Sequence, residues 1–227
     1  MELMQNLFKG QKLRIIDISQ PITSETACFP GDVPFSKNLT VSYQQSNVIN
    51  LTALTMSPHV GTHADSPVHV HGSMEDGLEM AGQMPLEPFI GPVTVLDLAP
   101  HSGPITAEHI DGKIPHSMAE RVLFRTTDRI RFDVFETTYP SFTPGLVEYM
   151  AMLGVRLMGI DTPSVDAVEA KVLETHNQLI KREMFWLENL DLTSVKPGNY
   201  FLVALPLRFM ELEASPVRAI LLESTQE

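Results

Sequence analysis

Residues 57–72, SPHVGTHADSPVHVHG, concentrate side chains that can bind a metal ion. Within thirteen residues the chain carries His59, His63, Asp65, His69 and His71. All five positions are odd-numbered, so an extended strand would place these side chains on one side of the chain. Imidazole nitrogens and a carboxylate that converge in this way predict a site for zinc, manganese or a similar divalent ion.

The same segment disfavours a helix, because Pro58, Gly61 and Pro67 interrupt it. Pro67 requires an edge strand, a bulge or an irregular loop at this point. The alternative interpretation is a solvated histidine-rich loop, or histidines that are hydrogen-bonded within a core. Three histidines and an aspartate with strand parity favour the metal site over these alternatives.

Further ligands are expected from elsewhere in the chain. Two histidines and one aspartate leave open positions around a metal, which favours hydrolytic chemistry over a closed structural site. The best distant candidates are His176 and Glu188, which are twelve residues apart in a region typical of a helix followed by a strand or turn. Taken alone, His176 is more typical of a surface helix and Glu188 of a solvated acid.

The stretch HVGTHADSPVH resembles the motif H-x-G-[TA]-H-x-D-x-P-x-H of the metal-dependent cyclase-like hydrolases. Other stretches resemble, in order, the bacterial kynurenine formamidase branch of that family. They are FPGDVPF at 29–35, LTMSPHVGTHADSPVH at 54–69, GVRLMGIDTPSVD at 154–166, LENL at 187–190 and LVALPLRFMELEASPVRAI at 202–220. The resemblance covers nearly the whole chain, from about residue 16 to residue 220.

This resemblance implies a centre of two divalent metals, usually zinc, that share Asp65 as a bridging ligand. The ligands that it implies are His59, His63 and Asp65 for the first metal and Asp65, His176 and Glu188 for the second. The twelve-residue step from His176 to Glu188 matches the spacing in the family. The resemblance also implies that His69 is the general acid/base beside the metal pair.

The activity implied by the resemblance is hydrolysis of N-formyl-L-kynurenine to L-kynurenine and formate, a step of tryptophan degradation, by a metal-bound hydroxide. Zn²⁺ lowers the pKa of a bound water to about 7, which supplies hydroxide near neutral pH. A neutral histidine with an ordinary pKa near 6.5 suits the proton transfer expected of His69. It would take the proton of the nucleophile and deliver it to the departing aniline nitrogen.

Three positions depart from the formamidase pattern. The chain has Phe29 where Trp is common before PGD, Asn177 where a second histidine is common, and Ala167 where proline is common. We expect Phe29 and Asn177 near the pocket, with Phe29 binding substrate, so these departures bear on the substrate. A related hydrolase that acts on another amide, such as isatin, is therefore the first alternative. A metal-binding protein without catalysis is the second, although the intact His69 argues against it.

Several other residues have plainer interpretations. Asp161, Thr162, Ser164 and Asp166 either line the pocket and support a ligand histidine or form a hydrogen-bonded turn. Lone Cys28 is expected to be buried, and Trp186 to lie in the core. His71 is left out of the site. The three histidines expected at the surface are His101, His109 and His116.

Composition sets the class of protein. The 227 residues include 43% hydrophobic and 19% charged residues, enough for a packed core. Sixteen basic and 28 acidic side chains give a net charge of −12, which argues against binding nucleic acid or an anionic membrane. One cysteine cannot form an internal disulfide, and no apolar window is long enough to span a membrane. We expect an acidic, cytoplasmic enzyme with a small-molecule substrate.

The elements that position the site are expected to form a mixed α/β fold. The family resemblance implies a partly barrel-like central β-sheet with flanking helices, of the swivelling β/β/α type. Residues 1–227 are expected to form one domain. The resemblance implies a homodimer or higher homo-oligomer in which residues 1–12 are a dimerisation arm; the alternative for these residues is a disordered tail. Hydrophobic patterns predict strands over 13–18, 47–56, 93–98, 121–125, 155–160, 200–205 and 217–222. They predict helices over 144–152 and about 168–180.

Overall fold

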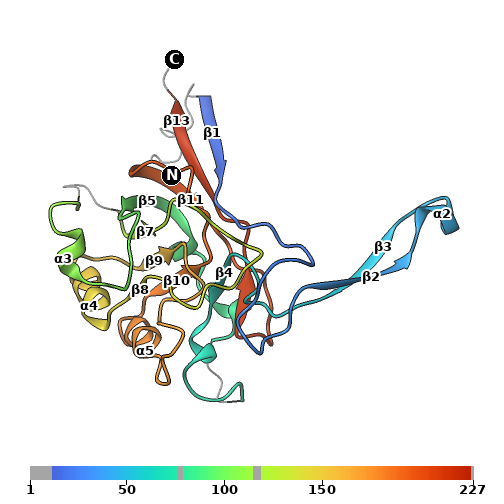
Figure 1. Ribbon diagram of the computed structural model, residues 1–227, viewed down its shortest axis with the longest axis horizontal. Coiled ribbons are helices and arrows are strands. Elements are labelled where there is room, and N and C mark those ends of the chain that lie inside the picture. The colour runs from blue at the N-terminus through green and yellow to red at the C-terminus, as the bar shows by residue number, and fades with distance from the viewer. Residues whose placement is uncertain (1–11, 76–78, 115–118, 226–227) are drawn as a thin grey trace.

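A nine-stranded, curled sheet dominates the computed structural model, which describes residues 12–75, 79–114 and 119–225 (Figure 1). The strand order is β1-β13-β11-β5-β7-β9-β10-β4-β12. The bounds are β1 Lys12–Asp17, β4 His63–Asp65, β5 Ile90–Asp97, β7 Arg121–Arg125, β9 Leu157–Ile160, β10 Phe185–Glu188, β11 Gly198–Val203, β12 Ala214–Pro216 and β13 Ile220–Thr225. Strands β5, β7, β9 and β10 run parallel, and the pairs at both ends of the sheet are antiparallel. The expected mixed α/β fold with a partly barrel-like sheet is confirmed.

Shorter elements surround this sheet. Two small two-stranded sheets pair β2 (Ser36–Val41) with β3 (Leu51–Thr55), and β6 (Pro104–Ile105) with β8 (Ser141–Phe142). The α-helices are α2 Tyr43–Ser46, α3 Ala107–Ile110, α4 Pro144–Met152 and α5 Glu174–Lys181. The 3₁₀ turns are η1 Pro67–His69, η2 Ala81–Gln83 and η3 Glu87–Phe89. In the described part of the chain, no helix has the length and apolar character needed to cross a membrane.

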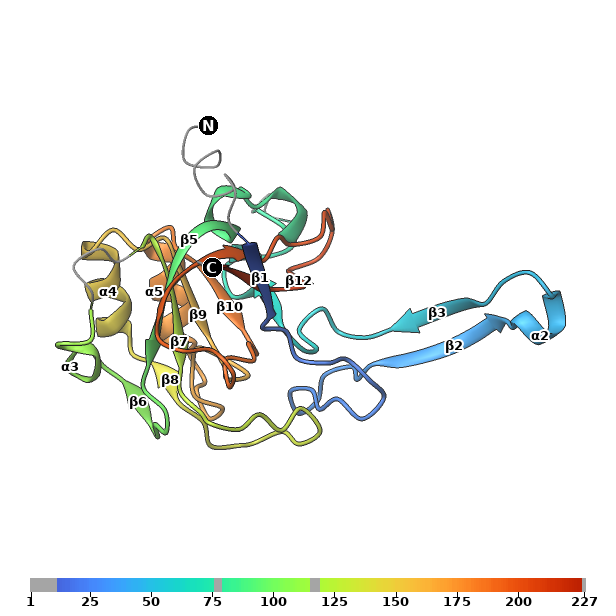
Figure 2. The ribbon, with the colours of Figure 1, turned by 90° about the horizontal axis from the view of Figure 1, so that it is seen from above.

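Two hydrophobic cores lie on opposite faces of the sheet. In β7, Val122 and Phe124 join the core that includes α4 and α5, whereas Leu123 joins the core on the other face. Such alternation is expected because successive side chains of a strand point to opposite faces. Helices α3, α4 and α5 lie together on one side of the molecule (Figure 2). Strands buried on both faces explain the nearly continuous apolar runs in the sequence.

The two predicted helices differ in how well the sequence located them. The prediction for 144–152 is confirmed by α4, where the Thr143 side chain accepts a hydrogen bond from the Leu146 amide and Pro144 occupies the first turn. The prediction for 168–180 is wrong in its first half, because α5 begins only at Glu174. The carboxylate of Asp166 accepts hydrogen bonds from the amides of Thr175 and His176. These contacts bend the preceding segment back over the start of the helix.

Most predicted strands lie within a few residues of their observed bounds. The strand expected over 47–56 is shorter, because Asn47 adopts a left-handed conformation with φ of 55° that ends α2, and β3 begins at Leu51. The strand expected over 217–222 begins later, at Ile220. Residues 1–11 of the expected amino-terminal arm lie outside the described residues, and Lys12 opens β1.

A single extended course for residues 57–72 is wrong. Only His63–Asp65 forms a strand, turns precede it, and η1 follows at Pro67. Gly61, with φ of +72°, allows the turn that precedes β4. Pro67 occupies the first position of η1, where its fixed φ angle is favourable. Strand parity therefore holds only for His63 and Asp65, and β4 is not an edge strand because it lies between β10 and β12.

A hairpin of β2, α2 and β3 projects far from the sheet in both views (Figures 1 and 2). Both of its strands are exposed along nearly their whole length. Its two ends continue into segments that reach the histidine-rich stretch, so the hairpin is anchored close to the candidate site. We call residues 36–55 the arm.

The centre of the sheet tolerates no added side-chain volume at Gly159. A Cβ atom there would lie 2.5 Å from Leu123 Cδ2 and 2.8 Å from Leu190 Cδ1. We predict that Gly159→Ala lowers the free energy of unfolding by about 1–3 kcal/mol, because the core must shift to admit the methyl group. Chemical denaturation should measure this loss.

The control is Gly145→Ala in α4, where a Cβ would meet no atom within 4 Å. That substitution should leave stability unchanged or raise it by up to about 1 kcal/mol, because alanine favours a helix. Equal effects at the two glycines would contradict this account of the core.

Candidate metal centre and active site

The register of the sheet brings distant residues to the histidine-rich segment. In β4, Ala64 packs into one core, so His63 and Asp65 face the opposite side. Strand β10 pairs Glu188 with His63, although these residues are far apart in the sequence. The site therefore forms where a short, buried strand meets the end of β10.

Each carboxylate oxygen of Asp65 faces different histidines. Oδ1 lies 3.0 Å from His59 Nδ1 and 3.4 Å from His63 Nε2. Oδ2 lies 3.7 Å from His176 Nε2 and 4.0 Å from His69 Nε2. The carboxylate is thus shared between two groups of imidazoles.

Glu188 connects the same two groups from the other side. Its Oε2 lies 3.2 Å from His63 Nε2, and its Oε1 lies 3.4 Å from His176 Nε2. The Val165 amide also donates a hydrogen bond of 2.8 Å to Oε1. The structure therefore brings together all six residues that the sequence nominated, namely His59, His63, Asp65, His69, His176 and Glu188.

The donor atoms fit a divalent cation. His63 Nε2 and Asp65 Oδ1 are buried and have no hydrogen-bond partner. Two sets of donor atoms lie within 4.8 Å of one another among the described residues: His59, Asp65 and His69, and His63, Asp65 and Glu188. Imidazole and carboxylate are the ligands that zinc and manganese accept, so the buried, unpaired atoms are explained if a metal binds between them.

The Nδ1 atoms of His63 and His176 already have hydrogen-bond partners. His63 Nδ1 lies 2.9 Å from the carbonyl oxygen of Gly61, and His176 Nδ1 lies 2.6 Å from Asp166 Oδ2. Both contacts hold the ring with Nε2 directed at Asp65 and Glu188, as metal-binding histidines usually are. Asp166 thus holds the ring of His176, a candidate ligand, and also accepts hydrogen bonds from the Thr175 and His176 amides.

Trp186 has a polar role that sequence reasoning missed. It is buried as expected, but its Nε1 donates a hydrogen bond of 3.1 Å to Asp65 Oδ2. Its ring also meets the His176 ring edge-on, with centroids 5.3 Å apart. The clue in the sequence is its position two residues before Glu188, which places both side chains on the same face of β10.

Charge governs protonation in the cluster. Burial disfavours charged His59, but Asp65 and Glu213 outweigh burial and raise the pKa of His59 to about 10. Burial also opposes ionisation of Asp65, yet the surrounding histidines hold its pKa well below the usual range. For His69, burial together with nearby His59 and His176 lowers the pKa despite the attraction of Asp65. The ring of His69 is therefore neutral near neutral pH.

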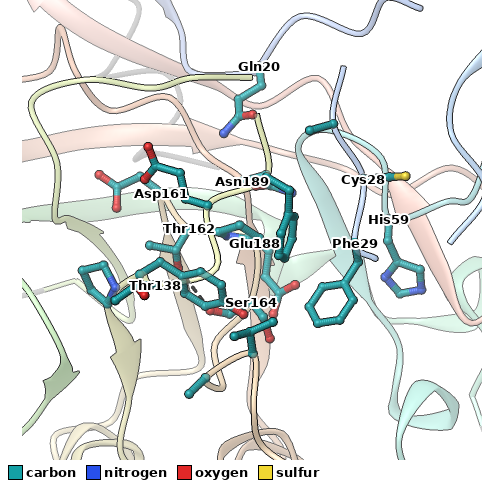
Figure 3. A pocket seen from close by; sticks show the side chains of 18 of the residues that line it. Gln20, Cys28, Phe29, His59, Thr138, Asp161, Thr162, Ser164, Glu188 and Asn189 are labelled. Atoms are coloured by element: carbon teal, nitrogen blue, oxygen red, sulfur yellow. Dashed lines mark hydrogen bonds between the residues drawn. The ribbon is translucent and has the colours of Figure 1, made fainter. Parts of the chain in front are cut away.

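A cavity of about 720 Å³ opens beside the cluster. His59, His63, His69, His176 and Glu188 all line it. Figure 3 shows the Phe29 ring between His59 and the side of the pocket that carries Glu188 and Ser164. The aromatic side chains in the lining are Phe29, Phe132, Phe135 and Tyr139, and the rings of Phe29 and Phe135 meet edge-on at 5.1 Å. The lining thus combines these aromatic residues, which we call the aromatic wall, with the histidines and Glu188 of the cluster.

Some other sequence expectations need correction. Asn177 does not line the cavity; its side chain is exposed and donates a hydrogen bond to the carbonyl of Leu173. His101 lines the cavity instead of lying at the surface. Cys28 is only partly buried and also lines the cavity, where burial raises the pKa of its thiol and disfavours a nucleophilic role.

The remaining histidines add little to the site. His71 is exposed and outside the cavity, which agrees with leaving it out of the site. His109 is exposed as expected, and His116 lies outside the described residues.

Known proteins resemble this chain over most of its length. The Cyclase family model, described as "Putative cyclase", matches residues 16–167. The chain is 41% identical over 210 residues to the kynurenine formamidase of Bordetella avium, covering 92% of this chain and 98% of that protein. It is also 41% identical over 209 residues to the kynurenine formamidase of Paracidovorax citrulli, covering 90% of this chain and 94% of that protein.

Solved structures share the fold. Isatin hydrolase A from Labrenzia aggregata, bound to benzyl benzoate, superposes with a TM-score of 0.82 at 23% identity, covering 99% of this chain and 98% of that chain. A second structure, described as a potential metal-dependent hydrolase with cyclase activity, gives a TM-score of 0.75 at 24% identity, covering 95% of this chain and all of that chain.

Asp161, in the cavity wall, should give stability a distinct pH dependence. Burial raises its pKa from 3.8 to about 6, although Thr126 and the Thr127 amide donate hydrogen bonds to it. Folding therefore favours protonated Asp161, and this stabilisation is fully present below the ordinary pKa of 3.8 and is lost as the pH rises through 6. We predict that the free energy of unfolding of the wild type, minus that of Asp161→Asn, decreases by about 2 kcal/mol from pH 4 to pH 7.

Denaturation of both proteins across this pH range measures the difference. All other titrating groups are common to the two proteins and cancel. A difference that stays constant with pH, or that increases, would show that Asp161 ionises normally in the folded protein.

Proposed function

The chain belongs to the cyclase family, and from that premise we propose that it hydrolyses N-formyl-L-kynurenine to L-kynurenine and formate. The single observation that carries this proposal is the buried Asp65 carboxylate, whose two oxygens face separate sets of imidazoles that line a cavity. Relatives about 40% identical over nine-tenths of the chain, named kynurenine formamidase, support the substrate. The protein is in this account a hydrolase of an aryl formamide.

We assign the metal ligands as two sets that share Asp65. His59, His63 and Asp65 Oδ1 would hold one divalent metal, and Asp65 Oδ2, His176 and Glu188 the other, with zinc or manganese as the ions. When bound, such metals supply Lewis acidity that activates water and polarises the amide carbonyl. The distances from each Asp65 oxygen to its own imidazoles support this division.

His69 is assigned the proton transfers. Its ring lies beside the ligand His59, with centroids 4.4 Å apart, and its Nε2 is 4.0 Å from Asp65 Oδ2. Because its pKa is lowered, the ring can accept the proton of the attacking water. The same nitrogen then returns that proton to the departing aryl amine, which could not leave as an anion.

The aromatic wall positions the aryl group of the substrate. Phe29 and Phe135 present ring faces and edges that suit a benzene ring. Neighbouring Arg129, Arg131 and Lys171 in the cavity lining can attract the carboxylate of an amino-acid substrate. We therefore assign Phe29 to substrate binding, which its place in the cavity lining supports.

We predict that His69→Asn lowers kcat by about 10²–10⁴-fold while metal content stays at the wild-type level. The matched variant Asp65→Asn should instead lose metal, because a neutral amide is a weak bridging ligand. Formate release and elemental analysis measure the two effects. Loss of metal in His69→Asn would make His69 a ligand rather than the acid/base, an outcome that its proximity to His59 and Asp65 makes worth testing.

The substrate is tested directly with purified protein. Absorbance assays of N-formyl-L-kynurenine and of isatin, each with and without a chelator, separate the candidate activities. Chelator-sensitive turnover that favours N-formyl-L-kynurenine supports the proposal. Faster turnover of isatin would contradict the proposal and show that the protein is a hydrolase of the other substrate class. Metal binding without turnover of either substrate would show that the protein is not catalytic toward them.

We further propose that the protein is a homodimer that buries the arm against a second copy. An isolated two-stranded hairpin is marginally stable in water, yet Leu39, Leu51 and Leu54 of this one are each more than half exposed. Lys37 is the one charged residue in the arm, whereas the whole chain carries −12. The arm is therefore the part of an acidic protein that a second copy can cover without burying charge.

We predict that Leu39→Thr/Leu51→Thr/Leu54→Thr converts a dimer to a monomer in size-exclusion chromatography with light scattering. Threonine keeps the strand preference but removes apolar surface. The control Met152→Gln removes an equally exposed apolar side chain from α4 and should stay dimeric. A wild type that is monomeric at all concentrations, or a triple variant that remains dimeric, would refute this assembly.

A further inference from the structure

We infer that Glu213 is a positioning residue that fixes the ring of His59, so that Nδ1 rather than Nε2 faces the metal centre. The Oε1 atom of Glu213 lies 3.3 Å from His59 Nε2, while His59 Nδ1 lies 3.0 Å from Asp65 Oδ1. The inference rests on the proposed assignment of His59 as a metal ligand. It adds a residue that neither the histidine-rich motif nor the cavity lining contains.

The backbone holds Glu213 in place independently of its side chain. Its carbonyl oxygen accepts hydrogen bonds of 2.8 Å from both the amide and the hydroxyl of Ser66. The next residue, Ala214, opens β12 and pairs with Asp65. The side chain therefore starts from a position that is fixed relative to the centre.

The contact decides which nitrogen of His59 is available. An imidazole that binds a metal through one nitrogen is neutral and keeps its single proton on the other nitrogen, and an ionised carboxylate can only accept that proton. Glu213 therefore stabilises the proton on Nε2, which leaves the lone pair of Nδ1 directed at Asp65. His63 and His176 have the opposite arrangement, because Gly61 and Asp166 engage their Nδ1 atoms and leave Nε2 free.

The charge of Glu213 suits this role. Its side chain is partly buried, and its Oε1 lies within ion-pair distance of His59 Nε2. An ionised partner makes the imidazole a stronger ligand than a neutral partner would. Glu213 should accordingly affect the metal that His59 holds and leave the other unaffected.

The test is metal binding, measured by Zn²⁺ titration of metal-depleted full-length protein in competition with a chelating dye. In Glu213→Ala, one of the two equivalents should bind about 10–100-fold more weakly, and the other should bind as in the wild type. Glu213→Gln should lose less, because its amide oxygen still accepts the Nε2 proton. Glu211→Gln, an exposed acid on the same loop, is the matched control and should bind both equivalents normally.

Thermal unfolding of the metal-depleted proteins separates positioning from a structural role. Glu213→Ala should melt close to the wild type, because the Ser66 contacts use the backbone. Unchanged binding of both equivalents, equal weakening of both, or the same loss in Glu211→Gln would overturn the inference. A wild type that binds no Zn²⁺ would instead overturn the proposed function on which the inference rests.

Discussion

Two buried carboxylates beside one another are the constraint on which this site depends. Asp65 and Glu188 are 1% and 3% exposed, and neither faces bulk water. Burial and the charge of Asp65 both disfavour ionised Glu188, yet His176 and His63 hold its pKa below the usual value. Such a pair is tolerable only with compensating positive charge and hydrogen bonds, which histidine protons or metal ions provide.

Much of the surrounding structure satisfies that constraint. The Trp186 indole donates to Asp65 and the Val165 amide to Glu188, so that both carboxylates have a neutral donor as well as imidazoles. Asp166 has two functions, since it holds the His176 ring and also accepts the first amides of α5. The same carboxylate therefore contacts the start of that helix and holds the ring of His176.

The residues proposed to bind metal lie mainly on strands and a helix, whereas the aromatic residues that would contact substrate lie on loops. Four of the metal-binding candidates lie on β4 and β10 of the central sheet and on α5, which packs against it, whereas His59 lies in the turn before β4. The aromatic wall lies on loops, with Phe29 before the arm and Phe135 between β7 and β8. Side chains carried on loops can vary without disturbing residues on the sheet.

The sequence alone determined the donor types and much of the secondary structure. The histidine-rich segment, the strand over 121–125 and the helix over 144–152 follow from local composition, proline placement and capping at Thr143. What only the tertiary structure decided is how distant residues meet: the pairing of Glu188 with His63, the hydrogen bond from the Thr175 amide at the start of α5 to Asp166, and the contact of Glu213 with His59. Strand register and hydrogen bonds between remote segments fix these positions, and no local pattern encodes them.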